Sequence, residues 1–178
     1  MMWPGTIRWL VAGFLLAACA GGRAREEERG PMATEAELFD ALEALAASRP
    51  FRVDDVSRKT GLALAPDKDG TDEIFAVHRG RNPAGPLFVE AELRTPGPGA
   101  TAPDGILILT LNRAVAVTAR NATSRFGSEQ DLIVPTPRQP ADTPVYAVYR
   151  RPWGDLRLGF ERGGRRLLVK VVLDATGR

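Results

Sequence analysis

The sequence predicts an α+β protein made of two tandem units, each a short helix followed by a three-stranded antiparallel meander, with an extra amphipathic helix ahead of them. The main observation is an internal repeat, because EIFAVHRG at residues 73–80 is nearly repeated as PVYAVYRR at residues 144–151. A second observation is that each copy follows a short polar segment ending in glycine and precedes a turn. Similarity between two such segments indicates a duplicated structural unit.

The extra helix is expected over residues 35–47. Thr34 followed by Glu37 has the pattern of a capping box, which satisfies free N–H groups at the start of a helix. Pro50 cannot continue a helix and marks its end. One face of this helix carries the apolar side chains that can lie across a sheet, namely Leu38, Leu42 and Leu45.

The short helix of each unit is predicted within residues 51–61 and 117–127. These segments, FRVDDVSRKTG and VTARNATSRFG, are polar and long enough for one or two helical turns. Gly61 and Gly127 are expected at the C-terminal ends, because glycine adopts the backbone conformation that stops a helix. Thr118 is the expected N-cap of the second helix.

The two repeated segments alternate in polarity as half-buried strands do. Each is followed by a turn, NPAG or RPWG, and then by a second alternating strand, PLFVEAELR or DLRLGFER. The third strand of each unit, at 105–111 or 167–173, is the most apolar and is expected to be central or covered on both faces. Alternation places equivalent residues on matching faces: Phe75, Val77 and Arg79 in one unit, Tyr146, Val148 and Arg150 in the other.

We expect the leading helix and first unit to occupy residues 33–112 and the second unit residues 113–178. Residues 19–112 contain 11 Lys/Arg and 16 Asp/Glu, a balance of −5, whereas residues 113–178 contain 12 and 6, a balance of +6. This asymmetry reflects either solvated acidic stretches in the first half or a charged interaction surface. The net charge of the whole chain, +2, is too close to neutral to indicate a nucleic-acid partner.

The first 18 residues have the features of a secretory signal peptide. Arg8 precedes an apolar run at residues 9–18, which is too short to span a bilayer, and small residues follow. Residues 19–32, rich in glycine and charge, are predicted to be a flexible tether. Cys19 is the only cysteine in the chain, so the fold is expected to be stable without a disulfide.

The four residues LAAC at 16–19 resemble the lipobox of bacterial lipoproteins. The resemblance implies cleavage before Cys19 and lipidation of this residue, which would anchor the chain to a membrane. Ala20, where these families carry aspartate for inner-membrane retention, implies the periplasmic face of the outer membrane. The alternative is an ordinary signal peptide with a cysteine at this place by chance.

The expected unit of a helix and a meander is similar to small periplasmic lipoproteins of the BamE type. Its doubling resembles the tandem layout of the beta-lactamase inhibitor protein and of some lipoprotein immunity proteins. This resemblance is one of topology, and it carries over no functional residue beyond the lipobox cysteine.

The sequence contains no recognisable catalytic, metal or cofactor motif. The few serines lie outside any G-x-S-x-G elbow, and His78 is the only histidine, with a surface or packing role expected for it. The acidic run at residues 67–73 lacks the glycine and glutamate spacing of an EF-hand, so it is interpreted as a turn. We therefore expect a protein that is not an enzyme and binds no metal or cofactor.

Two functions fit these features: a protein-binding module, such as an inhibitor or immunity protein, and an envelope-maintenance scaffold for outer-membrane assembly or cell-wall contact. The second hairpin carries the candidate partner-binding residues, Tyr149, Arg150, Arg151 and Trp153. Tryptophan with flanking arginines at an exposed tip is typical of binding hot spots. Alternatively, Trp153 folds back over the hairpin and shields strand residues such as Leu156.

Overall fold

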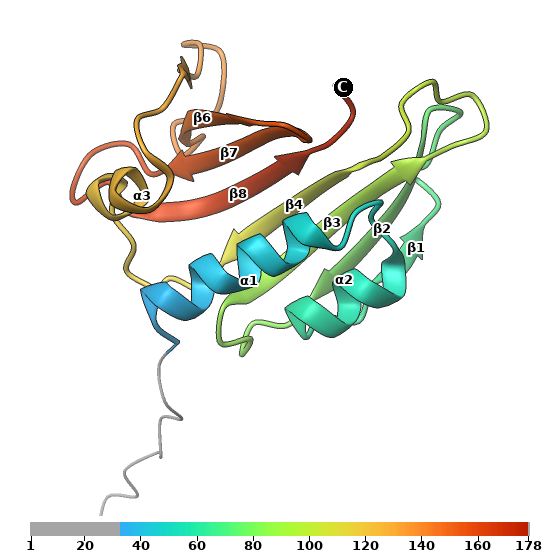
Figure 1. The fold of residues 1–178 in the computed structure, drawn as a ribbon, viewed down its shortest axis with the longest axis horizontal. Helices are drawn as coiled ribbons and strands as arrows, with labels where there is room; N and C mark the ends of the chain where they lie inside the picture. The colour runs from blue at the N-terminus through green and yellow to red at the C-terminus, as the bar shows by residue number, and fades with distance from the viewer. Residues whose placement is uncertain (1–32, 178) are drawn as a thin grey trace, which may run out of the picture. The chain divides into compact units, whose positions relative to one another are not determined.

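The computed structural model describes residues 33–177, which form three helices and one eight-stranded antiparallel sheet (Figure 1). The helices are α1 (Glu35–Ala47), α2 (Val53–Thr60) and α3 (Ala119–Phe126). The strands are β1 (Ala65–Asp67), β2 (Phe75–Arg81), β3 (Phe88–Pro96), β4 (Ile106–Leu111), β5 (Asp131–Ile133), β6 (Val145–Arg151), β7 (Gly154–Phe160) and β8 (Leu168–Asp174). The predicted α+β class is confirmed. The signal peptide, the tether and Cys19 lie outside the described residues.

Helix α1 begins and ends where its sequence predicts. The backbone N–H of Glu37 donates to the Thr34 hydroxyl at 3.2 Å, and the Thr34 N–H donates to the Glu37 carboxylate at 2.7 Å. This capping box satisfies two N–H groups that the first turn leaves unpaired. The helix buries one apolar stripe, formed by Leu38, Phe39, Leu42 and Leu45, against the sheet.

The strands follow the order β1-β2-β3-β4-β8-β7-β6-β5. The central pair is β4 with β8, where Ile106 lies opposite Asp174 and Thr110 opposite Lys170. These are the two most apolar strands of the sequence, and their predicted central place is confirmed. The strands after α2 therefore run from one edge to the centre, and the strands after α3 run from the other edge to the same centre.

The prediction of three strands per unit is wrong in number, because four strands follow each short helix. The additional strands, β1 and β5, have three residues each and form the two edges of the sheet. Both lie in short apolar segments that end at a proline, and this pattern alone does not indicate a strand. Pro66 lies inside β1 itself. Proline is tolerated at an edge, where one side of the strand donates to no neighbour.

The two short helices end at the predicted glycines, but in different conformations. Gly61 follows α2 with φ +70° and ψ 17°, the left-handed conformation of a C-cap. Gly127 follows α3 with φ +83° and ψ −167°, a region that is almost restricted to glycine. Thr118 caps α3 as predicted and accepts from the N–H of Asn121 at 3.4 Å.

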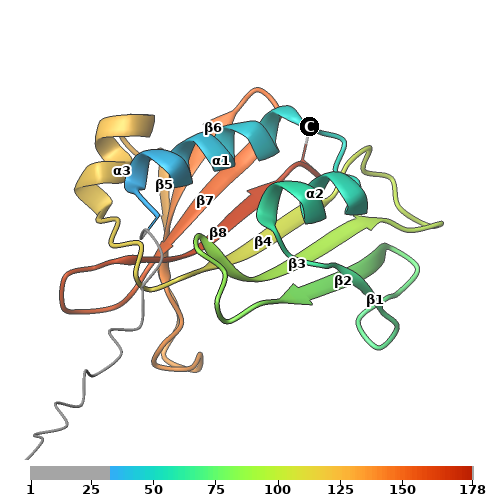
Figure 2. The ribbon, with the colours of Figure 1, turned by 90° about the horizontal axis from the view of Figure 1, so that it is seen from below.

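The helices cover one face of the sheet, and the core lies between them and the strands (Figures 1 and 2). Alternation along β4 illustrates this arrangement, since Leu107, Leu109 and Leu111 are buried under the helices and the intervening residues are only partly buried. Phe75 on β2 and Tyr146 on β6 lie on the opposite, helix-free face. Each pairs with a residue of the adjacent strand whose side chain points away from the core residues of that strand.

Candidate functional site

The turn between β6 and β7 brings the second hairpin close to the end of the sheet's central strand. Arg151 pairs with Gly154, and Pro152 and Trp153 form the turn between them. Gly154 has a φ of +143°, and a Cβ atom at this position would lie 2.1 Å from the carbonyl oxygen of Asp174. Glycine is therefore required for the hairpin to pass this closely over β8.

Tyr149 points away from this surface and into the core. Its side chain is 2% exposed, and its ring centre lies 5.7 Å from that of Phe126. Burial raises the pKa of the Tyr149 hydroxyl by disfavouring its charged form. Tyr149 cannot contact a partner in this structure and does not belong to the predicted binding patch. The alternation that the sequence shows already separates it from Arg150, which is exposed on the helix-free face.

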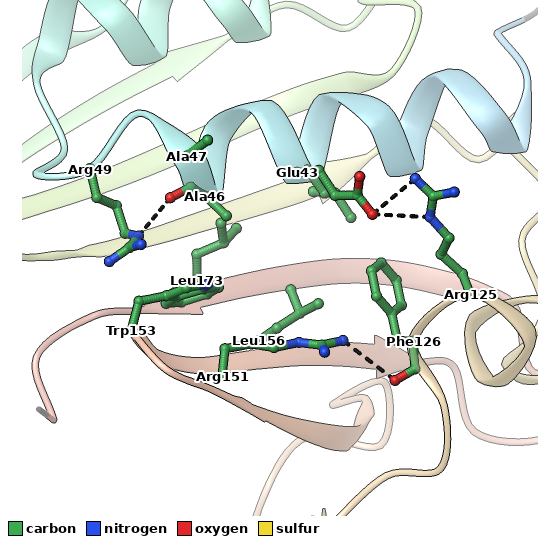
Figure 3. A pocket seen from close by; sticks show the side chains of 11 residues that line it. Glu43, Ala46, Ala47, Arg49, Arg125, Phe126, Arg151, Trp153, Leu156 and Leu173 are labelled. Atoms are coloured by element: carbon green, nitrogen blue, oxygen red, sulfur yellow. Dashed lines mark hydrogen bonds and ion pairs between the residues drawn. The ribbon is translucent and has the colours of Figure 1, made fainter.

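Trp153 lies beside the segment that follows α1. Trp153 is partly buried against the core. Its environment is therefore intermediate between the two alternatives that the sequence left open, an exposed hairpin tip and a side chain folded back over the strands. The guanidinium carbon of Arg49 lies 4.7 Å from the centre of its ring, within the range of a cation–π contact. The Nε of Arg49 also donates to the carbonyl oxygen of Ala46 at 2.6 Å (Figure 3). One cation–π contact and one hydrogen bond therefore fix the position of this arginine.

Arg151 makes a second contact of the same kind. Its guanidinium carbon lies 5.4 Å from the centre of the Phe126 ring, and its Nη2 donates to the Phe126 carbonyl oxygen at 3.5 Å. Phe126 is held in turn by Phe39 of α1, with the two ring centres 5.2 Å apart in an edge-to-face arrangement. The second arginine is thus positioned by the end of α3.

A pocket of about 390 Å³ lies between these two arginine–aromatic pairs (Figure 3). Its wall on one side is α1, which contributes Leu42 and Ala46, and its floor is formed by Leu156 of β7 and Leu173 of β8. We call it the arginine–aromatic pocket and define it by four residues, Arg49, Phe126, Arg151 and Trp153. Apolar side chains and cations therefore converge on one concave surface.

The charges around this pocket are unbalanced. Arg125 forms ion pairs with Glu43 at 2.9 Å and with Asp40 at 3.3 Å, so these three side chains together carry a net charge of −1. Arg49 and Arg151 form no ion pair with a carboxylate among residues 33–177. The residues that line the pocket, three arginines and Glu43, therefore have an excess of two positive charges over an apolar floor, and the nearby Asp40 reduces this excess to one. A positive excess favours a ligand with carboxylates.

Of the predicted binding residues, the structure brings Arg151 and Trp153 to the pocket and leaves Arg150 on the opposite face. Sequence reasoning missed Arg49 and Phe126, which are distant in the chain. Phe126 stands directly before the glycine that ends its helix, a common place for a side chain that packs onto a core, but nothing in the sequence connects it with Arg151.

The described part of the chain shows few other features that would indicate a catalytic or ligand-binding site. Residues 33–177 contain no cluster of three side chains that could ligate a metal, and no helix among them has the length and apolarity needed to cross a membrane. His78 is partly buried on β2, opposite Leu93 of β3. Comparisons with protein families, with curated proteins and with solved structures find no match to this chain.

Proposed function

We propose that this chain is a lipoprotein of the bacterial outer membrane that acts in the periplasm as a protein-binding module, as an inhibitor or immunity protein does. The LAAC sequence at residues 16–19 supports the anchor and the compartment. The arginine–aromatic pocket supports the binding role, since it combines a partly buried tryptophan with two arginines that have no acidic partner in the described residues. Tryptophan and arginine are the side chains most often found at binding hot spots.

We further propose that the sheet arose by duplication of one unit, now a helix followed by four strands. The strand order supports this, because both series of strands run from an edge to the centre. Phe75 and Tyr146 support it too, since they lie on the second strand of each series and on the same face. The duplication would leave α1 without a counterpart, and the pocket lies between α1 and the second series.

Site-specific photocrosslinking in the producing bacterium tests the binding role. A photoreactive residue at Pro152, which is exposed in the turn beside Trp153, should crosslink one defined protein. The same residue at Asp69, an exposed turn position of the first half, is the matched control and should not. Trp153→Ala should abolish the crosslink from Pro152.

The identity of the crosslinked species decides between the two functions. A secreted effector or hydrolase would support inhibition or immunity. Crosslinks to cell-wall material or to outer-membrane assembly proteins would contradict it and favour the envelope-maintenance scaffold. Equal crosslinking from Pro152 and Asp69 would contradict a binding site at the turn.

A further inference from the structure

We infer that the arginine–aromatic pocket recognises a peptide segment of a partner protein in which an apolar side chain is flanked by carboxylates. This inference rests on the proposed binding function and names the chemistry of its ligand. It is carried by the free donors of two arginines, by the apolar floor between them and by the charge of their surroundings.

Both arginines are held in place while most of their donors have no partner among residues 33–177. Each places its guanidinium over an aromatic ring and gives one hydrogen bond to a backbone carbonyl, Arg49 to Ala46 and Arg151 to Phe126. A guanidinium has five N–H donors in a planar fork, and this fork matches a carboxylate in two parallel hydrogen bonds. The cation–π contact and the hydrogen bond restrain each guanidinium, which lowers the conformational entropy lost on binding.

The space between the arginines suits an apolar side chain. Leu42, Leu156 and Leu173 line it and are at most 5% exposed, so they form a rigid apolar surface. A volume of about 390 Å³ lies at the lower end of the range for ligand sites and accommodates one large side chain with its neighbouring backbone. Figure 3 shows Arg49 with Trp153 at one end of this floor and Arg151 with Phe126 at the other.

The surroundings favour negative charge. Residues 113–178, which provide Trp153, Arg151 and the floor, carry a formal balance of +6. The negative end of α1 also faces this region, and two of its last carbonyls are already used. Leu45 accepts from the Ser48 N–H at 3.1 Å and the Ser48 hydroxyl at 2.8 Å, and Ala46 accepts from Arg49. A carboxylate entering beside Arg49 therefore meets its guanidinium, while the carboxylate that lines the pocket, Glu43, is paired with Arg125.

The ligand chemistry can be tested with blocked pentapeptides. The full chain with Trp3→Phe and Trp9→Phe leaves Trp153 as its only tryptophan, so its emission reports on the pocket. The probe has phenylalanine between two glutamates and neutral glycines outside them. One control replaces both glutamates by glutamine, and another replaces phenylalanine by glycine. We expect saturable blue-shifted emission with the probe and at least tenfold weaker binding of both controls.

Variants of the protein give the second arm of the test. Arg49→Gln and Arg151→Gln should each weaken binding of the probe by at least about tenfold, because each removes the charged hydrogen bonds to one carboxylate. Arg150→Gln removes an equal charge from the opposite face and should leave the affinity unchanged. Thermal melting of each variant shows whether a weaker affinity comes from loss of the fold, and a variant that has unfolded is replaced by Arg→Lys at the same position.

Several outcomes would overturn the inference. Equal binding of the glutamate and glutamine peptides would show a purely apolar site, and absence of binding by all three peptides would show no site for this ligand. Binding only after Glu26, Glu27 and Glu28 are changed to glutamine would make the chain's own acidic segment the occupant.

If the Pro152 crosslink persists while the peptides fail, the ligand chemistry is wrong and the binding function stands. If the peptides bind and the crosslink is absent, the pocket has the inferred ligand chemistry, but the proposal that its ligand belongs to a partner protein is wrong.

Discussion

Arg49 and Trp153 stack on each other with 4.7 Å between the guanidinium carbon and the ring centre, which joins the segment after α1 to the turn between β6 and β7. The contact connects the two halves of the chain at the surface, beside the end of β8. It also forms one end of the arginine–aromatic pocket. The stability of the fold and the shape of the pocket therefore depend on the same pair.

A double-mutant cycle on this pair measures its contribution. Trp153→Ala should destabilise the protein by about 2 kcal/mol, less than the ~3–5 kcal/mol of a fully buried tryptophan, because Trp153 is only partly buried. Arg49→Ala should cost about 0.5–1 kcal/mol, and the coupling between the two should be of similar size. Urea denaturation gives the three values. Strictly additive effects would contradict a direct interaction between these side chains.

The two glycines that end the short helices should respond differently to substitution. Gly61→Asn should cost only a few tenths of a kcal/mol, because asparagine tolerates the left-handed conformation. Gly127→Asn should cost about 1–3 kcal/mol, because φ +83° with ψ −167° is nearly closed to other residues. No atom lies within 4 Å of a Cβ placed at either site, so steric contact does not confound the comparison. Denaturation midpoints that fall equally would contradict the assigned conformations.

Glu92 should make stability depend on pH. Burial alone would raise its pKa, but hydrogen bonds from Arg94 at 2.6 Å and Arg79 at 2.9 Å outweigh burial, and the pKa lies below the usual 4.5. A lowered folded-state pKa means that the ion pairs contribute fully above pH 4.5 and that this contribution is lost as the pH falls through the folded-state pKa.

We therefore expect Glu92→Gln to be less stable than the wild type near neutral pH, with a difference that shrinks as the solution is acidified below pH 4.5. Urea denaturation across a pH series measures this difference. Glu73→Gln, at an exposed turn position, is the control and should show a smaller dependence. A Glu92→Gln difference that stays constant over the acid range would rule out the lowered pKa.

Cys19 should carry lipid. Metabolic labelling with a fatty-acid probe should mark the wild type and leave Cys19→Ser unlabelled, and only the wild type should sediment with outer membranes. Ala20→Asp provides a matched variant, since it should keep the label and move the protein to the inner membrane. Release of the wild type by osmotic shock without detergent would contradict the anchor.

Local patterns predicted much of this fold. Thr34 with Glu37 located the start of α1, and alternation placed Phe75 and Tyr146 on matching faces, because caps and strand periodicity depend on residues close together in the chain. The edge strands β1 and β5 were not predicted. Each has only three residues, with proline nearby, and this is too short for the alternation of polar and apolar residues that identifies a strand.

The candidate site could be predicted only in part. Trp153 and Arg151 stood out by residue type, but their contacts with Arg49 and Phe126 come from segments far away in the chain. Tyr149 was grouped with Arg150 because they are adjacent, although adjacent residues of a strand point to opposite faces. Such contacts between distant residues are determined by tertiary packing, which cannot be inferred from a single sequence.

The strand that joins the two halves of the sheet is β8, the last of the described elements in chain order. During synthesis the segment with α1, α2 and β1 to β4 emerges first, and the edge of β4 that pairs with β8 stays unpaired until β8 follows. Contacts between residues so far apart in sequence slow folding, because a long loop must close before they form. The sheet is therefore completed late in folding, and until then the edge of β4 that pairs with β8 is available for pairing with other chains.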